Sequence, residues 1–183
     1  MALPDRIEGL AIVSDDGMIA DASGKQPEAL KLEADQRYFR RTLDQAAALV
    51  HGKNSGEGGP DASRRRRLIL TRQIAGLAPA PGVPRAMLWN PAGATLTEAW
   101  DALGLSGGLL VVIGGSGPFG EFLPRYDAFH LSRSTMRSST FSMAASLRIV
   151  PVACGRPSRN RFCLRKSSGS RLSARAIMSV WLS

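Results

Sequence analysis

The chain has 183 residues, of which 44% are hydrophobic, and it carries a formal net charge of +9. This length suits one domain with a sizeable core, and the longest apolar run, LLVVI, is too short to cross a membrane. The start contains no basic region followed by a long apolar stretch, so we expect a cytoplasmic protein. The two cysteines, Cys154 and Cys163, are too few for a disulfide framework and are expected to be free thiols.

The positive charge is concentrated near the C-terminus. All 15 acidic residues occur by Asp127, whereas ten of the 24 Lys and Arg residues follow His130. The net charge therefore says little about what the folded body binds, and by itself it supports neither a nucleic-acid nor a membrane partner. Whether the protein forms a homodimer is left open.

The first predicted elements are a strand and a helix. The segment EGLAIVSDDGMIA predicts a strand over Leu10–Ser14, closed by a turn at residues 15–17. The segment KLEADQRYFRRTLDQAAALVHG predicts an amphipathic helix that packs on a sheet, because apolar residues recur at helical spacing. The residues on that face are Leu32, Phe39, Leu43 and Ala46.

Asp35 is the unusual member of this helix. It lies four residues before Phe39 and so projects toward the apolar side, while Arg37, Arg40 and Arg41 can reach water. A carboxylate on that side must be paired, hydrogen-bonded or neutral with a raised pKa, because stranding a buried charge is expensive. Alternatively, Asp35 lies at the edge of the helix or caps a local group.

Further elements alternate along the chain. The segment AAALVHG predicts a helix end followed by a short strand, and RRRRLILTR predicts a strand over Leu68–Thr71. Arg64–Arg67 form either a nucleic-acid patch or a solvated loop, and no aromatic residues lie between them to stack on bases. After a Pro-rich loop, RAMLWN predicts another strand. Then ATLTEAWDALG predicts a helix with Thr95 and Glu98 at capping-box spacing and Gly104 as its end.

The segment GLLVVIGGSGPFGEFLPRYDAFHL combines a strand, a glycine-rich turn and a short amphipathic segment. Gly115, Gly117 and Gly120 match G-x-G-x-x-G spacing, but the acid that a Rossmann unit carries about 20 residues later is absent. Two interpretations remain: an anion-binding turn, since glycines let backbone N–H groups approach a phosphate, or a tight turn without a ligand. The following strand has Phe129 on one side and His130 on the other.

The alternation of strands and helices indicates an α/β domain with a largely parallel sheet. No metal site is predicted, because His51 and His130 are the only histidines and have no recognisable carboxylate partner. Each is expected to be structural.

In this order, the elements resemble the dihydrofolate reductase superfamily, which includes the pyrimidine reductase domain of riboflavin biosynthesis. The resemblance covers residues 7–133, and its most specific part is a strand ending in Gly-Gly, an aromatic soon after and the pattern F-L-P-x-x-D. It implies a three-layer α/β domain over residues 1–133 with a largely parallel central sheet. It also implies an oxidoreductase that uses NADPH to reduce a pterin-like or pyrimidine-like ring.

On the substrate side, the resemblance implies that Asp35 faces the ring and helps to supply the proton that accompanies hydride transfer. Ser132 matches a hydroxyl that supports this acid and the substrate. The Leu-Pro-Trp signature of true dihydrofolate reductases is replaced by PEALKLE, and the substrate-phosphate signature of the riboflavin branch is absent. The substrate is therefore left open between folate-like and riboflavin-pathway compounds.

On the cofactor side, the resemblance implies NADPH, because Lys53 and Arg72 would supply positive charge for its extra phosphate. Other matched residues form the nicotinamide wall and its loop, the phosphate turn, the ribose-phosphate strand end and the pyrophosphate turn with its aromatic. The cofactor residues are Ala11, Met18, Ile19, Gly52, Lys53, Asn54, Ser55, Thr71, Arg72, Ile113, Gly114, Gly115, Ser116, Gly117 and Phe119.

Residues 134–183 form a tail rich in Ser and Arg that does not match the superfamily. We expect the C-terminal strands to be missing or altered, and interpret the tail as either disordered or read out of frame, which inspection of the gene's other frames tests. Two alternative functions remain: a basic nucleic-acid-binding protein acting through Arg64–Arg67 and the tail, or a non-catalytic remnant.

Overall fold

The computed structural model describes residues 2–14, 19, 26, 30, 33–55 and 59–134, together with the backbone of a strand at 177–182. Its strands are β1 (Arg6–Val13), β2 (Ala48–Gly52), β3 (Arg67–Leu70), β4 (Leu77–Pro79), β5 (Ala86–Trp89), β6 (Leu109–Gly114), β7 (Ala128–Arg133) and β8 (Ile177–Leu182). Its helices are α1 (Glu33–Gln45), α2 (Leu96–Ala102) and α3 (Ser116–Glu121), with 3₁₀ turns η2 (Ala62–Arg64) and η3 (Leu123–Arg125).

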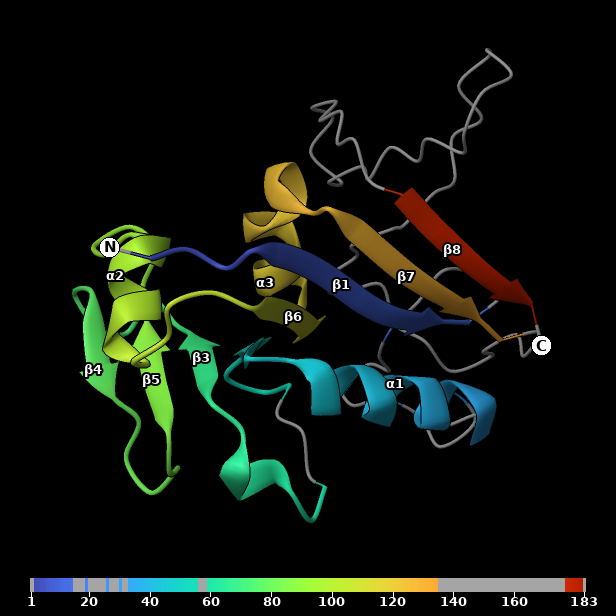
Figure 1. Ribbon diagram of the computed structural model, residues 1–183, viewed down its shortest axis with the longest axis horizontal. Coiled ribbons are helices and arrows are strands. Elements are labelled where there is room, and N and C mark those ends of the chain that lie inside the picture. Colours follow the sequence, from blue (N-terminus) through green and yellow to red (C-terminus); the bar gives the residue numbers. More distant parts are fainter. Residues whose placement is uncertain are drawn as a thin grey trace.

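The strands form one sheet in the order β4-β5-β3-β2-β6-β1-β7-β8 (Figure 1). Every neighbouring pair is parallel except β4 and β5, which are antiparallel. The α/β class and the largely parallel sheet predicted from the sequence are confirmed.

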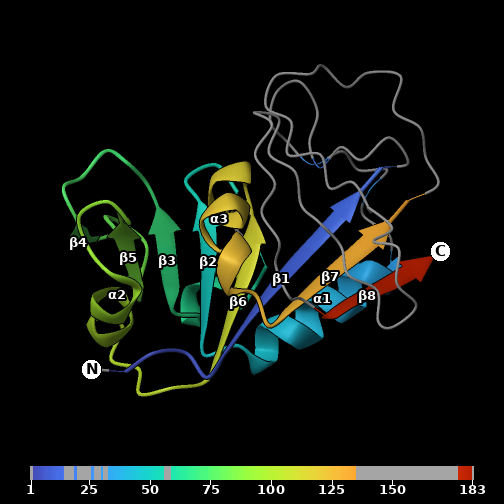
Figure 2. The ribbon, with the colours of Figure 1, turned by 90° about the horizontal axis from the view of Figure 1, so that it is seen from above.

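Successive residues of the central strands face opposite sides of this sheet. In β6, Leu110 and Val112 join a core cluster with Trp100 of α2, whereas Val111 joins a second cluster with Leu43 of α1. Strand geometry explains this division, because neighbouring side chains point to opposite faces. Helix α1 therefore covers one face and α2 with α3 covers the other, which gives the three layers seen in Figures 1 and 2.

Helix α1 is amphipathic, as its sequence predicts. Leu43 is buried, and Tyr38 and Phe39 pack against its cluster. On the outer side, Arg37 pairs with Glu33 at 2.7 Å, and Arg40 and Arg41 are exposed. The apolar face thus docks the helix on the sheet, since burial of apolar area is the main attraction between such layers.

Helix α2 begins with the predicted capping box. The Thr95 hydroxyl accepts a hydrogen bond from the Glu98 backbone N–H at 3.2 Å, and Glu98 accepts one from the Thr95 backbone at 2.7 Å. The bond from the Thr95 backbone lowers the pKa of Glu98. Gly104 follows the helix with φ of 66°, a conformation that favours glycine.

The F-L-P-x-x-D pattern has a packing explanation. Phe122 and Leu123 are buried in the core, and Asp127 accepts a hydrogen bond from the Ile7 backbone N–H at 2.8 Å. The Asp127 backbone N–H also donates to the Ile7 carbonyl at 2.9 Å. The aspartate therefore ties the start of β1 to the start of β7.

Three sequence-based predictions of element bounds differ from the structure. Strand β1 begins at Arg6, four residues before the predicted start, and β3 runs over Arg67–Leu70. The Pro-rich loop contains β4, which pairs with β5 at the edge of the sheet. A proline is tolerated there, because an edge strand need not use every N–H group in pairing.

The arginine run is only partly a solvated loop. Arg64 is exposed and pairs with Asp61 at 3.4 Å, and Arg65 pairs with Asp44 at 2.7 Å. Arg67 belongs to β3 and is buried, with its guanidinium donating to the Ala62 carbonyl. The run therefore holds local structure together rather than presenting four equivalent free cations.

Strand β8 comes from the Ser/Arg-rich tail and lies parallel to β7, with Ile177 opposite Ala128 and Leu182 opposite Arg133. The rest of the tail, residues 135–176 and 183, and the predictions about it lie outside the described residues. No helix among the described residues is long and apolar enough to cross a membrane.

Candidate functional site

The predicted cofactor segments follow parallel strands and therefore share one edge of the sheet. Gly52 ends β2, Thr71 and Arg72 follow β3, and Gly114 ends β6 before the turn into α3. Strands β3, β2 and β6 are neighbours in the sheet. In open α/β sheets, ligands bind outside the carboxyl ends of the strands, so this edge is the candidate cofactor region.

The glycine turn after β6 packs directly on the loop after β2. A Cβ atom on Gly115 would lie 3.1 Å from Ser55 Oγ and 3.3 Å from Pro118 Cδ, and one on Gly114 would lie 3.2 Å from Ser55 Cβ. Gly115 has φ of 86° and ψ of 142°, which an L side chain rarely adopts. Glycines are thus needed for the two loops to meet, as a backbone cradle requires.

A second contact links the loops after β2 and β3. Lys53 Nζ donates to Gln73 Oε1 at 3.4 Å, and the Gln73 backbone donates to Thr71 Oγ1 at 3.2 Å. Thr71 is buried, whereas Lys53 and Arg72 are exposed. Two cationic side chains therefore follow neighbouring strands at the edge where the glycine turn lies.

Asp35 of α1 is half-buried, and Ser132 of β7 lies within interaction range of its carboxyl group and opposite Ile12 of β1. Burial raises the pKa of Asp35 above its ordinary value, and the Ser132 hydrogen bond opposes part of that rise. The raised pKa agrees with one of the alternatives predicted from the sequence, and the catalytic role of Asp35 stays a prediction.

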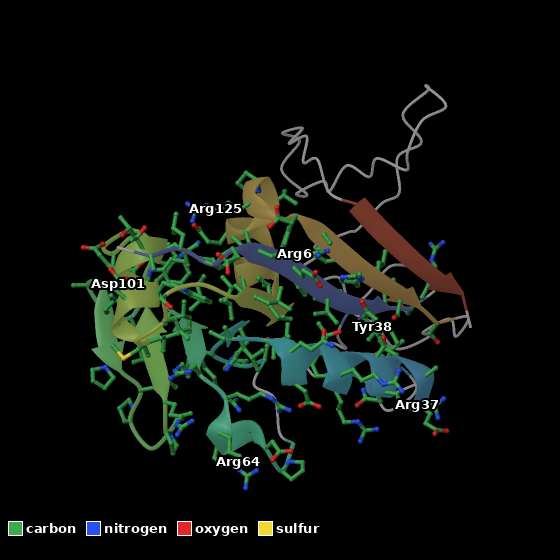
Figure 3. All side chains as sticks on the ribbon, viewed as in Figure 1. Arg6, Arg37, Tyr38, Arg64, Asp101 and Arg125 are labelled. Atoms are coloured by element: carbon green, nitrogen blue, oxygen red, sulfur yellow. The ribbon has the colours of Figure 1, made fainter. Side chains whose placement is uncertain are left out.

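A polar network of side chains lies beside this pair. Arg6 Nε contacts Glu8 Oε1 at 2.6 Å, His130 Nε2 contacts Glu8 Oε2 at 2.8 Å, and the Tyr38 hydroxyl contacts His130 Nδ1 at 2.8 Å. Figure 3 shows Tyr38 on the side of α1 that faces the strands, with Arg37 on the far side. Sequence reasoning treated His130 as structural and passed over Glu8 and Tyr38.

The sequence feature that could have indicated this polar network is the alternation of residues along a strand. His130 and Ser132 are two residues apart on β7 and so share a face, while Phe129 and Leu131 point into the opposite core cluster. His130 therefore lies on the same face of β7 as Ser132.

The other predicted cofactor residues lie in different surroundings. Ile113 packs against the cluster under α1, whereas Ala11 and Ile19 pack against the cluster on the opposite face. Phe119 is buried, with its ring 5.6 Å from that of Phe129, so its described contacts are those of a core residue. Met18 lies outside the described residues.

No protein-family model matches the chain, and no curated protein matches its sequence at a significant level. Among solved structures, a dihydrofolate reductase from Enterococcus faecalis, complexed with NADP(H) and RAB-propyl, is 21% identical with a TM-score of 0.52. The match covers 77% of this chain and 79% of that one.

A second similar structure is the diaminohydroxyphosphoribosylaminopyrimidine deaminase/5-amino-6-(5-phosphoribosylamino)uracil reductase from Thermotoga maritima. It is 18% identical with a TM-score of 0.54, and the match covers 76% of this chain and 47% of that one, so this chain spans about half of that protein. At these identities the likeness establishes architecture. The chain therefore has a dihydrofolate reductase-like fold, as the order of its motifs predicts.

Proposed function

We propose that this chain is an NADPH-dependent reductase that delivers hydride to a pterin-like or pyrimidine-like ring. One observation carries the proposal: a half-buried acid, Asp35, lies beside Ser132 in a fold shared with reductases, and burial raises its pKa. Carboxyl groups in such surroundings are candidates for proton transfer.

The residues at the carboxyl edge of the sheet fit a nicotinamide dinucleotide. The turn carries no side chain at Gly114, Gly115 and Gly117, and glycines let backbone N–H groups approach a pyrophosphate closely. Lys53 and Arg72 would bind the extra phosphate of NADPH, because cations make strong charge-assisted hydrogen bonds to phosphate. When bound, NADPH supplies the hydride, and the dihydrofolate reductase neighbour is an NADP(H) complex.

Asp35 would act on the proton side of the reaction. Desolvation favours its neutral form, which can donate a proton to a ring nitrogen, and Ser132 orients the carboxyl group for this transfer. The two solved neighbours differ in the ring that their names give, a dihydrofolate and an aminouracil. These two compounds are the substrates to test.

The first experiment measures thermal unfolding of the full chain with increasing NADPH and, in parallel, NADH. A ligand that binds only the native state raises the midpoint, so we expect an NADPH-selective rise. NADPH oxidation is then followed at 340 nm with dihydrofolate or with 5-amino-6-(5-phosphoribosylamino)uracil. A midpoint indifferent to both cofactors contradicts the cofactor assignment, and selective binding without oxidation of NADPH contradicts the two substrates.

A further inference from the structure

A polar network of four side chains connects β1, β7 and α1. Its members are Arg6, Glu8, His130 and Tyr38. The side chains of Glu8 and His130 are only 11% and 14% exposed. Each Glu8 oxygen has its own partner, Arg6 on Oε1 and His130 on Oε2. Both ring nitrogens of His130 are also engaged. Glu8 and His130 are thus largely buried with their polar atoms paired, whereas the Arg6 side chain is 57% exposed and Tyr38 is partly buried. Pairing of the buried groups stiffens a polar network.

The direction of each hydrogen bond follows from chemistry. A carboxylate accepts only, so His130 Nε2 carries the proton that is donated to Glu8. In the neutral ring Nδ1 is then an acceptor, and Tyr38 must donate its hydroxyl hydrogen to it. Burial raises the pKa of Tyr38, Glu8 raises it further, and Thr42 and Arg6 lower it. The phenol is therefore a donor at neutral pH.

Two members of this polar network lie close in sequence to Asp35 and Ser132. Tyr38 follows Asp35 by three residues and so shares its face of α1, and His130 precedes Ser132 by two residues and shares its face of β7. Helix and strand are joined by the Tyr38–His130 hydrogen bond at 2.8 Å, one helical turn from the point where Asp35 and Ser132 interact. A hydrogen bond of this length between a helix residue and a strand residue restricts the position of α1 along β7.

Other contacts also hold α1. Leu43 packs in an apolar cluster with Leu10, Leu49 and Val111. This attraction is non-directional, so it does not fix the position of the helix along β7. Asp44 pairs with Arg65 at 2.7 Å and anchors the end of α1 to the segment before β3, whereas the Tyr38–His130 hydrogen bond lies nearer Asp35 and joins the helix to β7.

We propose that Glu8, His130 and Tyr38 are positioning residues, which lock α1 against β7 and thereby hold the Asp35 carboxyl on the Ser132 hydroxyl. The inference rests on the proposed function only for the importance of Asp35 to the reaction. The placement of α1 against β7 is a property of the protein without ligands. Among the described side chains, the ionisable groups facing His130 are Arg6 and Glu8 from β1 and Tyr38 from α1.

The test follows the titration of Asp35 by carboxyl NMR in the full chain, with neither cofactor nor substrate present. Tyr38→Phe removes one hydroxyl and keeps the ring. The bond from Ser132 lowers the Asp35 pKa. Loosening that bond should therefore raise the pKa above the wild-type value. Ser132→Ala should raise it too, and the double variant should match Ser132→Ala alone, because both changes act on one contact.

Two further variants keep the outcome decisive. His130→Gln retains a donor toward Glu8 and lacks the ring nitrogen that Tyr38 reaches, so it should reproduce the rise even if Tyr38→Phe does not fold. Leu43→Val is the matched control, because it weakens the apolar packing of the same helix. It should lower the unfolding midpoint and leave the Asp35 pKa unchanged.

An unchanged Asp35 pKa in Tyr38→Phe and His130→Gln would overturn the proposal, as would full additivity with Ser132→Ala. An equal rise in Leu43→Val would also overturn it, since any loosening of α1 would then suffice. None of these outcomes depends on NADPH or on turnover, so a failed reductase assay cannot be confused with a failed positioning role.

Discussion

Ser132 on β7 lies beside the carboxyl group of Asp35 on α1. Burial raises the pKa of Asp35, and the hydrogen bond with Ser132 lowers it, so the pair relates a late strand of the sheet to the first helix. A contact between two residues so distant in the chain exists only when the sheet is assembled. Two predictions depend on it.

Asp35→Asn should slow turnover and spare cofactor binding. Asn keeps the shape and a hydrogen-bonding group for Ser132 and cannot donate a proton as an acid, so we expect a loss of roughly 10²–10⁴-fold in kcat. NADPH oxidation and NADPH-induced thermal stabilisation are measured on the same preparation. An equal loss of both would show that Asp35 is structural.

The same variant should change how stability depends on pH. Asp35 has a folded pKa above its ordinary value of 3.8, so its contribution to stability is present below pH 3.8 and is lost as pH rises through the folded pKa. Asp35→Asn removes the cost of ionising this half-buried carboxyl group. The variant's advantage over the wild type in urea unfolding should therefore be larger at pH 7 than at pH 4, and a constant difference would contradict the raised pKa.

Gly115→Ala should weaken both the fold and NADPH binding. A Cβ atom would lie 3.1 Å from Ser55 Oγ at a φ of 86°, and a strained conformation of this kind costs of order 1–3 kcal/mol. Gly104→Ala is the matched control, because Gly104 also has positive φ and no neighbouring atom within 4 Å. It should destabilise the chain and leave the cofactor dissociation constant unchanged.

Arg72→Gln should reduce the preference for NADPH over NADH. A net contribution of roughly 1.5–3 kcal/mol for a hydrogen bond to a charged group corresponds to about 10- to 100-fold in Kd for NADPH. Binding of NADH, which lacks the extra phosphate, should hardly change. Arg125→Gln removes an exposed cation of η3 and serves as the control for net charge. Equal loss of both cofactors would contradict the assignment of Arg72.

Gly9→Ala should destabilise the core under β1. A Cβ atom would lie 2.4 Å from Phe129 Cδ2 and 3.0 Å from Tyr126 Cε1, in an aromatic pair whose ring centroids are 5.2 Å apart. Overpacking of this kind costs about 1–3 kcal/mol in urea unfolding. Gly120→Ala in α3 has open space around its Cβ and should be neutral or stabilising.

The sequence by itself determined the features that depend on neighbours in the chain. The capping box of Thr95 and Glu98, the inward face of α1 with Asp35, and the alternation of Phe129 and His130 all follow from local spacing. The alternation of strands and helices was sufficient to predict the α/β class, because each class of element has its own short-range pattern. The finer architecture came from the resemblance of their order to a known superfamily.

Tertiary structure alone decided which of these side chains meet. The edge pairing of β4, the burial of Arg67, and the bridge from Tyr38 through His130 to Glu8 were missed. In the bridge, each member belongs to a different element, and no local spacing relates β1, α1 and β7. Parallel pairing sets their register, and only then can a donor find its acceptor, because a hydrogen bond acts over about 3 Å.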